Sequence, residues 1–298
     1  MKNEELERRC NYYLQVIRTI RSKVFEEKID SIVFSKDRAM QLHAFLESYL
    51  EMVTNRGALY VLYKTTSVRH RRSYDEIINQ YCSKGVVFIE ELDFREQLID
   101  ICKKSLSKTI GLFVDDMIFL QRIDYKDILN YDTLDYVVSL GRGSDLTYSI
   151  VLQKAIMLPS FTPSVNGFLL FKWDEVKEYS DWSYPLGVGG YFYGNAELNV
   201  MLENIGFKAP NSLENNLQYF KPFFIHRYGV CHNQVAAVNV AANLVQTESY
   251  NPVFNTFSIE ELLRLWEEGN MIDLDKFYGV AGSIAQEQNY QFIKRMTW

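Results

Sequence analysis

The stretch Phe-Val-Asp-Asp-Met-Ile-Phe, residues 113–119, places two adjacent acids, Asp115 and Asp116, inside an otherwise apolar run. The apolar residues 109–114 predict a buried strand, so the acids follow its carboxyl end. Ligands of open α/β sheets bind outside the carboxyl ends of strands. Two adjacent buried carboxylates oppose each other's ionisation, and a divalent cation relieves that repulsion. The stretch therefore predicts a strand that ends in a metal site; the alternative is a turn whose acids cap a following helix.

Apolar runs alternate with helical periods on the N-terminal side of this strand. Short continuous apolar runs predict buried strands, and apolar residues three and four apart predict helices. Strands are expected over 31–34, 58–63, 86–89 and 109–114, with helices over 41–54, 73–81 and 93–106. This alternation is typical of a mostly parallel sheet with helices on both faces, so the predicted fold class is α/β and Rossmann-like.

The pattern is less regular outside this core region. Strands are expected over 134–140 and 167–171, and helices over 195–205, 212–219, 258–269 and 281–296. Residues 1–28 predict an N-terminal amphipathic helix, because the following apolar residues fall near helical spacing: Tyr13, Leu14, Ile17, Ile20 and Val24. The charges of this helix are mixed in sign, and packing on the core, on a second copy or on a membrane surface all stay open.

Composition argues against several classes of function. Lys and Arg number 32 against 38 Asp and Glu, a net charge of −6, so we expect no nucleic-acid partner. The four cysteines form no CxxC pair, which argues against a zinc site. Neither a signal-peptide core nor a transmembrane-length apolar run is present, so the sequence predicts a cytoplasmic protein. The basic cluster at 69–72 is interpreted either as a solvated helix start or as an attractor of phosphates.

Polar side chains also follow the other expected strands. Ser35, Asp37 and Arg38 come directly after the first strand, and Lys64 ends the second. Arg95 lies at the start of the expected helix 93–106, which leads into the strand before the acids. Because the carboxyl ends of parallel strands meet at one edge of a sheet, we expect these groups near Asp115 and Asp116.

These segments resemble the GT-A-fold glycosyltransferases, and in particular bacterial enzymes of the family 2 type. Residues 113–119 look like the DxD-type motif of that superfamily, and residues 35–38 look like its first-strand loop. Further segments are similar to uncharacterised glycosyltransferases of surface-polysaccharide synthesis: 139–143, 147–149, 181–186, 210–214 and 238–246. The resemblance spans about residues 30–270.

The resemblance implies roles for the polar residues of the first half. Asp116 would bind Mn²⁺ or Mg²⁺ on the diphosphate of a sugar nucleotide, and His232 would be a third metal ligand, with His226 as its rival. The remaining candidates would contact the nucleotide sugar: Ser35, Asp37, Arg38, Lys64, Arg95 and Asp115. An Arg is suited to such a contact because its fork binds phosphate oxygens in pairs.

The second half would supply the acceptor side. Asp181 and Glu197 are the carboxylates expected to serve as the catalytic base. Arg142, Trp182 and Tyr191 are the expected acceptor-binding residues, with the indole as a stacking platform for a sugar. Gly189-Gly190-Tyr191 departs from the resemblance, because similar sequences carry Asp-Gly-His in that position.

The sequence thus predicts transfer of a sugar from a nucleotide-diphosphate sugar to a glycan or lipid-linked acceptor. Two alternatives stay open: a non-catalytic nucleotide-binding or assembly protein that retains the fold, motivated by residues 189–191, and a sugar-phosphate nucleotidyltransferase. The expected division is an N-terminal helix (1–28), a nucleotide-sugar-binding half (29–122), an acceptor-binding half of the same domain (123–250) and C-terminal helices (251–298). Peripheral membrane association and a homodimer are further expectations.

Overall fold

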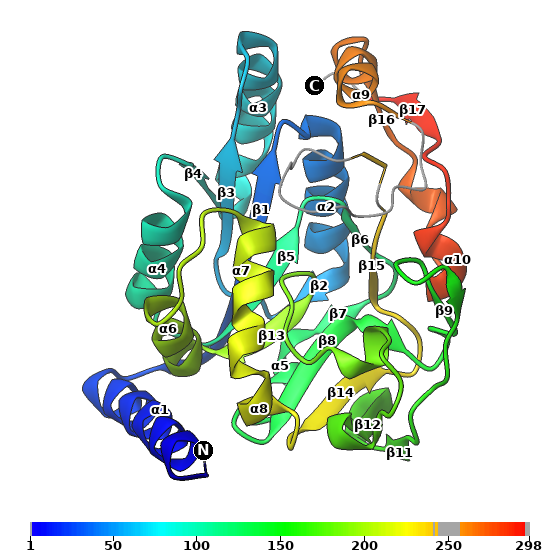
Figure 1. Cartoon of the computed structure of the whole chain (residues 1–298). Coiled ribbons are helices and arrows are strands. Elements are labelled where there is room, and N and C mark those ends of the chain that lie inside the picture. Colours follow the sequence, from blue (N-terminus) through cyan, green and yellow to red (C-terminus); the bar gives the residue numbers. More distant parts are fainter. Residues whose placement is uncertain (1, 241, 244–256, 296–298) are drawn as a thin grey trace.

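A computed structural model describes residues 2–240, 242–243 and 257–295, and a nine-stranded sheet forms its centre (Figure 1). The strands of this sheet are β1 (Glu26–Lys36), β3 (Leu59–Lys64), β4 (Val86–Glu90), β5 (Ser107–Val114), β8 (Tyr136–Gly143), β11 (Thr162–Pro163), β12 (Phe168–Lys172), β13 (Tyr191–Gly194) and β14 (Tyr228–His232). Their order across the sheet is β11-β12-β14-β8-β13-β5-β1-β3-β4. Strands on both sides of the predicted boundary at residue 122 therefore share one sheet.

The strands around the Asp115-Asp116 turn run mostly in one direction. β4, β3, β1 and β5 are parallel neighbours, with Val33 of β1 opposite Val61 on one side and Phe113 on the other. β13 is antiparallel to both β5 and β8, and β8 is parallel to β14. The carboxyl ends of β1, β3, β5, β8 and β14 consequently lie along the same edge.

Helices cover both faces of the sheet. On one face α2 packs with α3 and α9, and on the other α4 packs with α6 (Figure 1). The helices are α1 (Lys2–Ser22), α2 (Ala39–Met52), α3 (Val68–Tyr81), α4 (Phe94–Lys104), α5 (Tyr125–Ile128), α6 (Asn195–Glu203), α7 (Pro210–Leu217), α8 (Lys221–Phe224), α9 (Ile259–Glu267) and α10 (Gly282–Gln286). The predicted α/β fold, with a mostly parallel sheet between helices, is confirmed.

Short strands and single 3-10 turns complete the fold. The strands outside the main sheet are β2 (Val53–Thr54), β6 (Met117–Phe119), β7 (Ile123–Asp124), β9 (Tyr148–Ser149), β10 (Lys154–Ala155), β15 (Ala237–Asn239), β16 (Asn270–Ile272) and β17 (Phe292–Lys294). The 3-10 turns are Cys82–Lys84, Val165–Gly167, Trp173–Glu175, Asp181–Ser183, Gln218–Phe220 and Leu274–Lys276. Among the described helices, none combines the length and the apolarity that crossing a bilayer requires.

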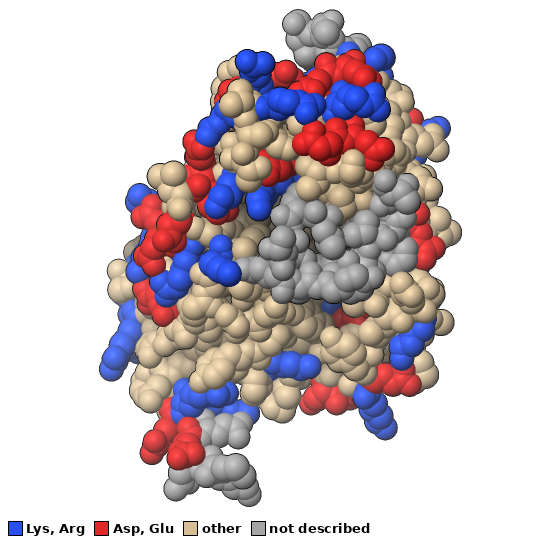
Figure 2. Space-filling view, turned by 45° about the horizontal axis from the view of Figure 1, so that its top comes forward, with Lys and Arg blue, Asp and Glu red and all other residues tan. Residues whose placement is uncertain are grey.

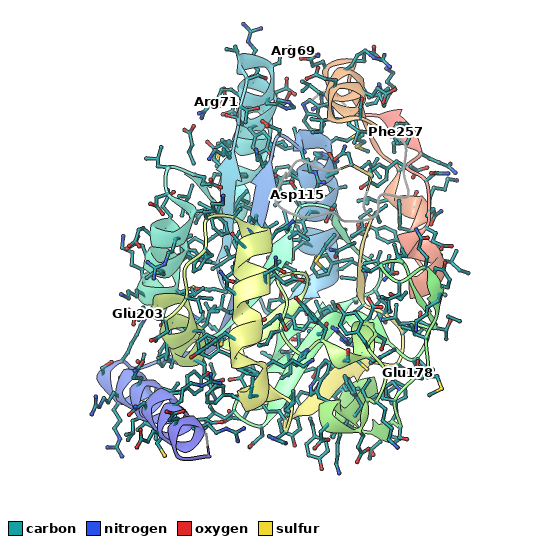
Figure 3. The ribbon with its side chains drawn as sticks, in the orientation of Figure 1. Arg69, Arg71, Asp115, Glu178, Glu203 and Phe257 are labelled. Carbon is teal, nitrogen blue, oxygen red and sulfur yellow. The ribbon has the colours of Figure 1, made fainter. Side chains whose placement is uncertain are left out.

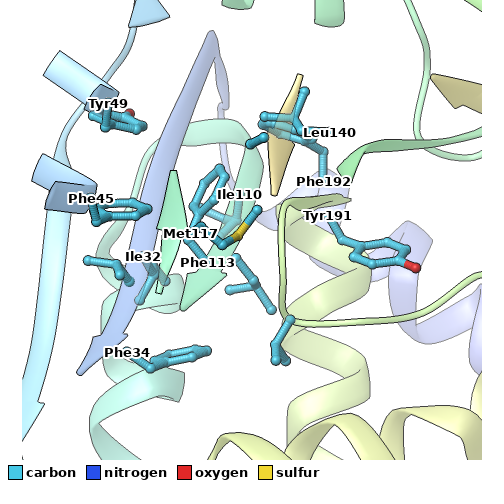
Figure 4. Close-up of a cluster of buried hydrophobic side chains, with 14 of the residues drawn as sticks. Ile32, Phe34, Phe45, Tyr49, Ile110, Phe113, Met117, Leu140, Tyr191 and Phe192 are labelled. Atoms are coloured by element: carbon cyan, nitrogen blue, oxygen red, sulfur yellow. The ribbon is translucent and has the colours of Figure 1, made fainter. Parts of the chain in front are cut away.

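An aromatic cluster packs against one face of β5 (Figure 4). The ring of Phe113 lies 5.8 Å from Phe45 of α2 and 6.0 Å from Phe192 of β13. Gly111 makes this packing feasible, because a Cβ there would lie 2.7 Å from the Phe113 ring and 3.0 Å from the Phe192 ring. Dense packing of this kind fixes the end of β5, and with it the turn that follows.

The C-terminal prediction was wrong in part. The expected helix over 281–296 is confined to α10, and β17 then pairs antiparallel with β16, with Ile272 opposite Phe292. Tyr290 is buried and Phe292 is half-buried, whereas Gln291 and Ile293 are exposed. Burial that alternates every second residue belongs to a strand and not to a helix.

Candidate active site

The two acids form a tight turn between β5 and β6 at the carboxyl edge of the sheet (Figure 3). Asp115 is 3 % exposed, and the side chain of Asp116 is 12 % exposed. The backbone of the turn is fixed on both sides: the Asp115 N–H donates to the Phe34 carbonyl of β1 (3.2 Å), and the Val240 N–H donates to the Asp116 carbonyl (2.8 Å). Both acids are thus held in place by neighbouring strands, and no helix follows for them to cap.

Arg38 bridges the two carboxylates with its single positive charge. Its Nη1 donates to Asp115 Oδ1 and to Asp116 Oδ2, at 3.0 Å each. Its Nε donates to the side-chain oxygen of Asn243 (3.0 Å), and its Nη2 donates to the carbonyl of the same residue. Burial lowers the pKa of Arg38, but the two carboxylates outweigh burial and the pKa is raised overall. The guanidinium therefore stays charged and holds the two carboxylates of the turn.

Ser35 forms a hydrogen bond with the second carboxylate oxygen of Asp115. Its hydroxyl donates to Asp115 Oδ2 at 2.8 Å and also contacts the hydroxyl of Tyr74 on α3. The Tyr74 hydroxyl accepts in turn from the Arg38 N–H at 3.1 Å. Burial raises the pKa of Asp115 to about 6, although the Arg38 guanidinium opposes that rise. Both oxygens of Asp115 are consequently engaged by protein donors.

Asp116 keeps one oxygen unengaged. Its Oδ1 is buried and has no hydrogen-bond partner among the described residues. A buried carboxylate oxygen without a donor is costly unless a cation or a ligand meets it. Mg²⁺ and Mn²⁺ bind through one or two carboxylates and complete their shells with water and phosphate oxygens, so Asp116 fits such an ion.

His232 lies apart from this group. Two strands, β13 and β8, separate β14 from β5, which places His232 roughly 14 Å from β5 at about 4.8 Å per strand. Its ring centroid lies 4.1 Å from that of Phe168, and burial lowers its pKa to about 4. In the part of the chain that the structure describes, no three His, Cys, Asp or Glu side chains form a metal-binding group. The position of His232 does not support its predicted role as a third ligand.

His226, the rival ligand, lies at the other end of β14. Its Nδ1 is 3.8 Å from a carboxylate oxygen of Asp174, and its side chain is mostly exposed. The amino end of β14 is the edge opposite the acidic turn, so His226 does not join Asp116 either.

Asp37 joins the loops after β1 and β3. Its two carboxylate oxygens accept from the N–H and the hydroxyl of Thr66, at 2.8 and 2.7 Å. Its own N–H donates to the Lys64 carbonyl (3.1 Å), and its φ is +54°, a conformation that few residues other than glycine adopt. The Lys64 ammonium pairs with Glu91 at 2.9 Å and stays half-exposed at the same edge. Asp37 therefore shapes the loop, and Lys64 remains accessible beside it.

Arg95 and Glu197 both form structural contacts that hold α6 in place. Arg95 donates to the carbonyls of Leu202 and Ile205 at 3.2 Å each, at the carboxyl end of that helix. Glu197 is 2 % exposed and forms two 2.8 Å bonds with the Arg227 guanidinium. Both of its carboxylate oxygens accept from Arg227 and the side chain is shielded from solvent, so these surroundings count against the role predicted for Glu197.

Arg142 organises the predicted acceptor residues. Its guanidinium donates to the carbonyls of Asp181 and Tyr184 and lies 5.0 Å from the ring centroid of Tyr191. The Trp182 ring is 0 % exposed and donates from Nε1 to the Leu146 carbonyl (3.3 Å). A fully buried ring offers no face to a sugar, so the structure gives Trp182 a core position. Asp181 Oδ2 is buried without a hydrogen-bond partner in the described residues.

Glu214 is a carboxylate that the sequence did not single out as functional. It lies on α7, where its Oε2 accepts from the Val188 N–H at 3.0 Å and the Tyr184 hydroxyl is a second partner. Burial raises its pKa. Val188 belongs to the loop that ends at Gly190, and a Cβ on Gly190 would lie 2.9 Å from Met117 Cε. Glu214 is thus linked to the residue next to Asp116 through one short loop.

The basic cluster at 69–72 begins α3 and is largely paired. Arg69 binds Glu260 and Glu267 of α9 at 2.8 and 2.7 Å, and Arg71 binds Glu90. Figure 2 shows acidic and basic side chains alternating over this end of the molecule. These contacts join α3 to α9, which agrees with the interpretation as a solvated helix start.

One curated relative is similar to most of this chain, while no protein-family model matches it. The chain is 25 % identical over 289 residues to the bifunctional glycosyltransferase pgtA of Dictyostelium discoideum. The chain is similar to a glycosyltransferase. That match confirms the predicted resemblance; it covers 86 % of this chain and 37 % of the relative, so the chain spans little more than a third of the relative's length.

Two solved structures are also similar. TarS of S. aureus in complex with UDP has a TM-score of 0.44 at 13 % identity, over 68 % of this chain and 57 % of TarS. A nucleotidyl transferase from Methanothermobacter thermautotroptrophicus has a TM-score of 0.41 at 11 % identity, over 82 % of this chain and 98 % of that one.

Proposed function

We propose that the chain transfers a sugar from a nucleotide-diphosphate sugar to a glycan or lipid-linked acceptor. The observation that carries the proposal is the buried turn Asp115-Asp116 at the carboxyl edge of the sheet, with one oxygen of Asp116 left for a cation. The similarity to a curated glycosyltransferase over most of the chain supports the same reaction.

Asp116 is the residue that would hold Mg²⁺ or Mn²⁺. When bound, the ion would act as a Lewis acid that stabilises charge on the departing diphosphate. Arg38 bonds to both acids of the turn and orients them, and Ser35 fixes Asp115 so that its backbone would border the donor. Lys64, half-exposed at the same edge, is a further cation for a phosphate.

Glu214 and Asp181 are the two carboxylates proposed for deprotonating the acceptor hydroxyl. A general base works best when its pKa approaches the working pH, and burial raises the pKa of Glu214 in that direction. Glu214 also touches the loop that packs on Met117, next to the metal-binding acid. We therefore favour Glu214 and retain Asp181, whose Oδ2 is unengaged among the described residues.

A thermal-shift panel tests the donor site. UDP, GDP, CDP and dTDP are compared with and without Mn²⁺ on the wild type, on Asp116→Asn and on Asp75→Asn, an exposed acid of α3 that serves as the matched control. A ligand that binds only the folded state raises the melting temperature. We expect a Mn²⁺-dependent rise with one nucleotide that Asp116→Asn abolishes and Asp75→Asn retains.

A turnover assay then separates the enzyme from its alternatives. Release of free nucleoside diphosphate from the sugar nucleotide that binds best supports transfer. Binding without release over a range of glycan and lipid-linked acceptors would favour the non-catalytic protein, and absence of any shift would overturn the donor site.

A further inference from the structure

α1 is fixed on the body of the protein by one face. Tyr12 and Val16 are 5 % and 1 % exposed. The Tyr12 hydroxyl donates to Glu197 Oε1 at 2.9 Å, and its ring centroid lies 4.7 Å from that of Phe223 on α8. The orientation of the helix about its axis is therefore determined, and so are the residues that it turns outward.

An apolar stripe occupies an outward face of α1. Tyr13, Ile17 and Ile20 are 39–44 % exposed, and their spacing of four and three residues places them along one side of the helix. Leu14 is half-exposed next to this stripe, and Val24 is 88 % exposed just beyond the helix end. Exposed apolar side chains that line up in this way indicate a binding surface more than scattered ones do.

The charged residues of α1 beside the stripe are basic. Between residues 8 and 24 the charged residues are Arg8, Arg9, Arg18, Arg21 and Lys23, with no acid among them. The acids of α1 are confined to its first two turns, at positions 4, 5 and 7. Arg18 and Arg21 are exposed, and at about 100° per residue Arg21 lies about 40° from Ile17 around the helix. The sequence predicted a helix with charges of both signs; in α1 the acids lie near the amino end, and the charged residues beside the stripe are basic.

A groove of about 340 Å³ continues the surface beyond Tyr13. Leu134 and Tyr228, each 41 % exposed, line it together with Arg9 and with Arg227, whose buried guanidinium is bonded to Glu197. Asp135 is the carboxylate in its lining. The groove joins α1 to the amino ends of β8 and β14, so apolar and basic groups cover one continuous area.

We propose that α1 and this groove bind the surface of a bilayer that contains anionic phospholipids. The stripe would enter the boundary between headgroups and acyl chains, and the arginines would pair with lipid phosphates. Charge complementarity favours an anionic lipid surface as the occupant, because a second copy would bring the same set of basic residues, without acids, to the contact. The inference is independent of the proposed reaction.

Vesicle co-sedimentation tests it with the full chain. The wild type is expected to bind vesicles of phosphatidylcholine mixed with phosphatidylglycerol, and to bind vesicles of phosphatidylcholine alone at least tenfold more weakly. Binding to the mixed vesicles should fall at about 1 M salt, where the screening length shrinks to about 3 Å.

Paired variants assign the binding to α1. Arg18→Glu/Arg21→Glu and Ile17→Ser/Ile20→Ser should each lower partitioning at least about tenfold, since one basic residue contributes about a factor of five near an anionic surface. Lys154→Glu/Lys177→Glu and Val151→Ser/Met157→Ser change exposed residues of the same kinds elsewhere and should bind like the wild type. Circular-dichroism melting curves check that every variant folds.

Three results would overturn the inference: no wild-type binding to the mixed vesicles, equal losses in the α1 and the control variants, or a lipid-free dimer that Ile17→Ser/Ile20→Ser dissociates in sedimentation velocity. The last result would assign the stripe to a second copy.

Discussion

At the turn after β5, one guanidinium forms ion pairs with two carboxylates. Arg38 is 9 % exposed, and its removal would leave Asp115 and Asp116 buried without a cation. Breaking a buried ion pair from one side costs about 3–5 kcal/mol. We expect Arg38→Met to lower the free energy of unfolding by about that amount in urea denaturation. Arg38→Lys, which keeps the charge but loses the fork, should lose less.

The companion experiment is the double variant Arg38→Met with Asp115→Asn. If the penalty of Arg38→Met comes from an uncompensated charge, neutralising Asp115 should return part of the lost stability. A full-size penalty in the double variant would mean that lost packing and the bonds to Asn243 cause the effect instead.

The base assignment is tested by two conservative changes. Glu214→Gln keeps the shape of the side chain and its bond from Val188 but removes the carboxylate. We expect kcat to fall by about 10²–10⁴ while the thermal shift with nucleotide and Mn²⁺ stays. Asp181→Asn is the parallel variant, and a large loss of kcat there with an active Glu214→Gln would transfer the role to Asp181.

The site was predictable where its residues follow strands directly. Asp115, Asp116, Ser35 and Arg38 come after β5 and β1, and the structure brings all four together. Tyr74 and Asn243 complete the same network from segments 36 and 205 residues away from Arg38 in sequence. No local pattern specifies such a contact, so these partners were not anticipated.

The loop before β13 illustrates how an element boundary can shape a site. Gly190 has a φ of +76° and packs on Met117. An alanine in the left-handed region costs about 1–2 kcal/mol, so Gly190→Ala should lower the free energy of unfolding by that amount. Gly206→Ala is the matched control, because a Cβ there meets nothing within 4 Å and its φ is not positive. Chemical denaturation of both variants measures the difference; equal stabilities would show that the loop adapts.

Elements with a strong local period were predictable, and others were not. The four parallel strands stand out because each contains a continuous apolar run; β1, β3 and β5 are buried, and β4 forms the edge of the sheet. β13 has only four residues and enters the sheet antiparallel between β5 and β8, so its place depends on partners distant in sequence. β17 is similarly short and needs β16 to define it. Short strands carry too few residues for a period to show.

The stability of the whole molecule should depend on pH through buried histidine. His43 is 4 % exposed between Tyr81 and Trp266, and burial first, then Arg295 and Lys84, lowers its pKa to about 3. The unfolded chain takes up this proton near pH 6.5, whereas the folded protein does so only near pH 3. Stability is therefore lost as pH falls through this window, by about 2 kcal/mol at pH 5.

His43→Leu isolates this contribution. When the pH is lowered from 7.5 to 5, the unfolding free energy of the wild type should fall by about 2 kcal/mol more than that of the variant. Urea denaturation curves at both pH values measure the difference. Identical pH dependence in the two proteins would contradict the buried neutral state of His43.

β5 separates two ends of the molecule that have different chemistry. Lys23, just after α1, donates to the Ser105 carbonyl at the amino end of β5, and Asp115 follows its carboxyl end. Eight residues at about 3.3 Å each give a spacing of about 26 Å. With α1 on a bilayer, the acidic turn would lie at the end of β5 turned away from the headgroups. Such an arrangement suits elongation of a glycan that already extends into solution, and disfavours addition of the first sugar to a lipid.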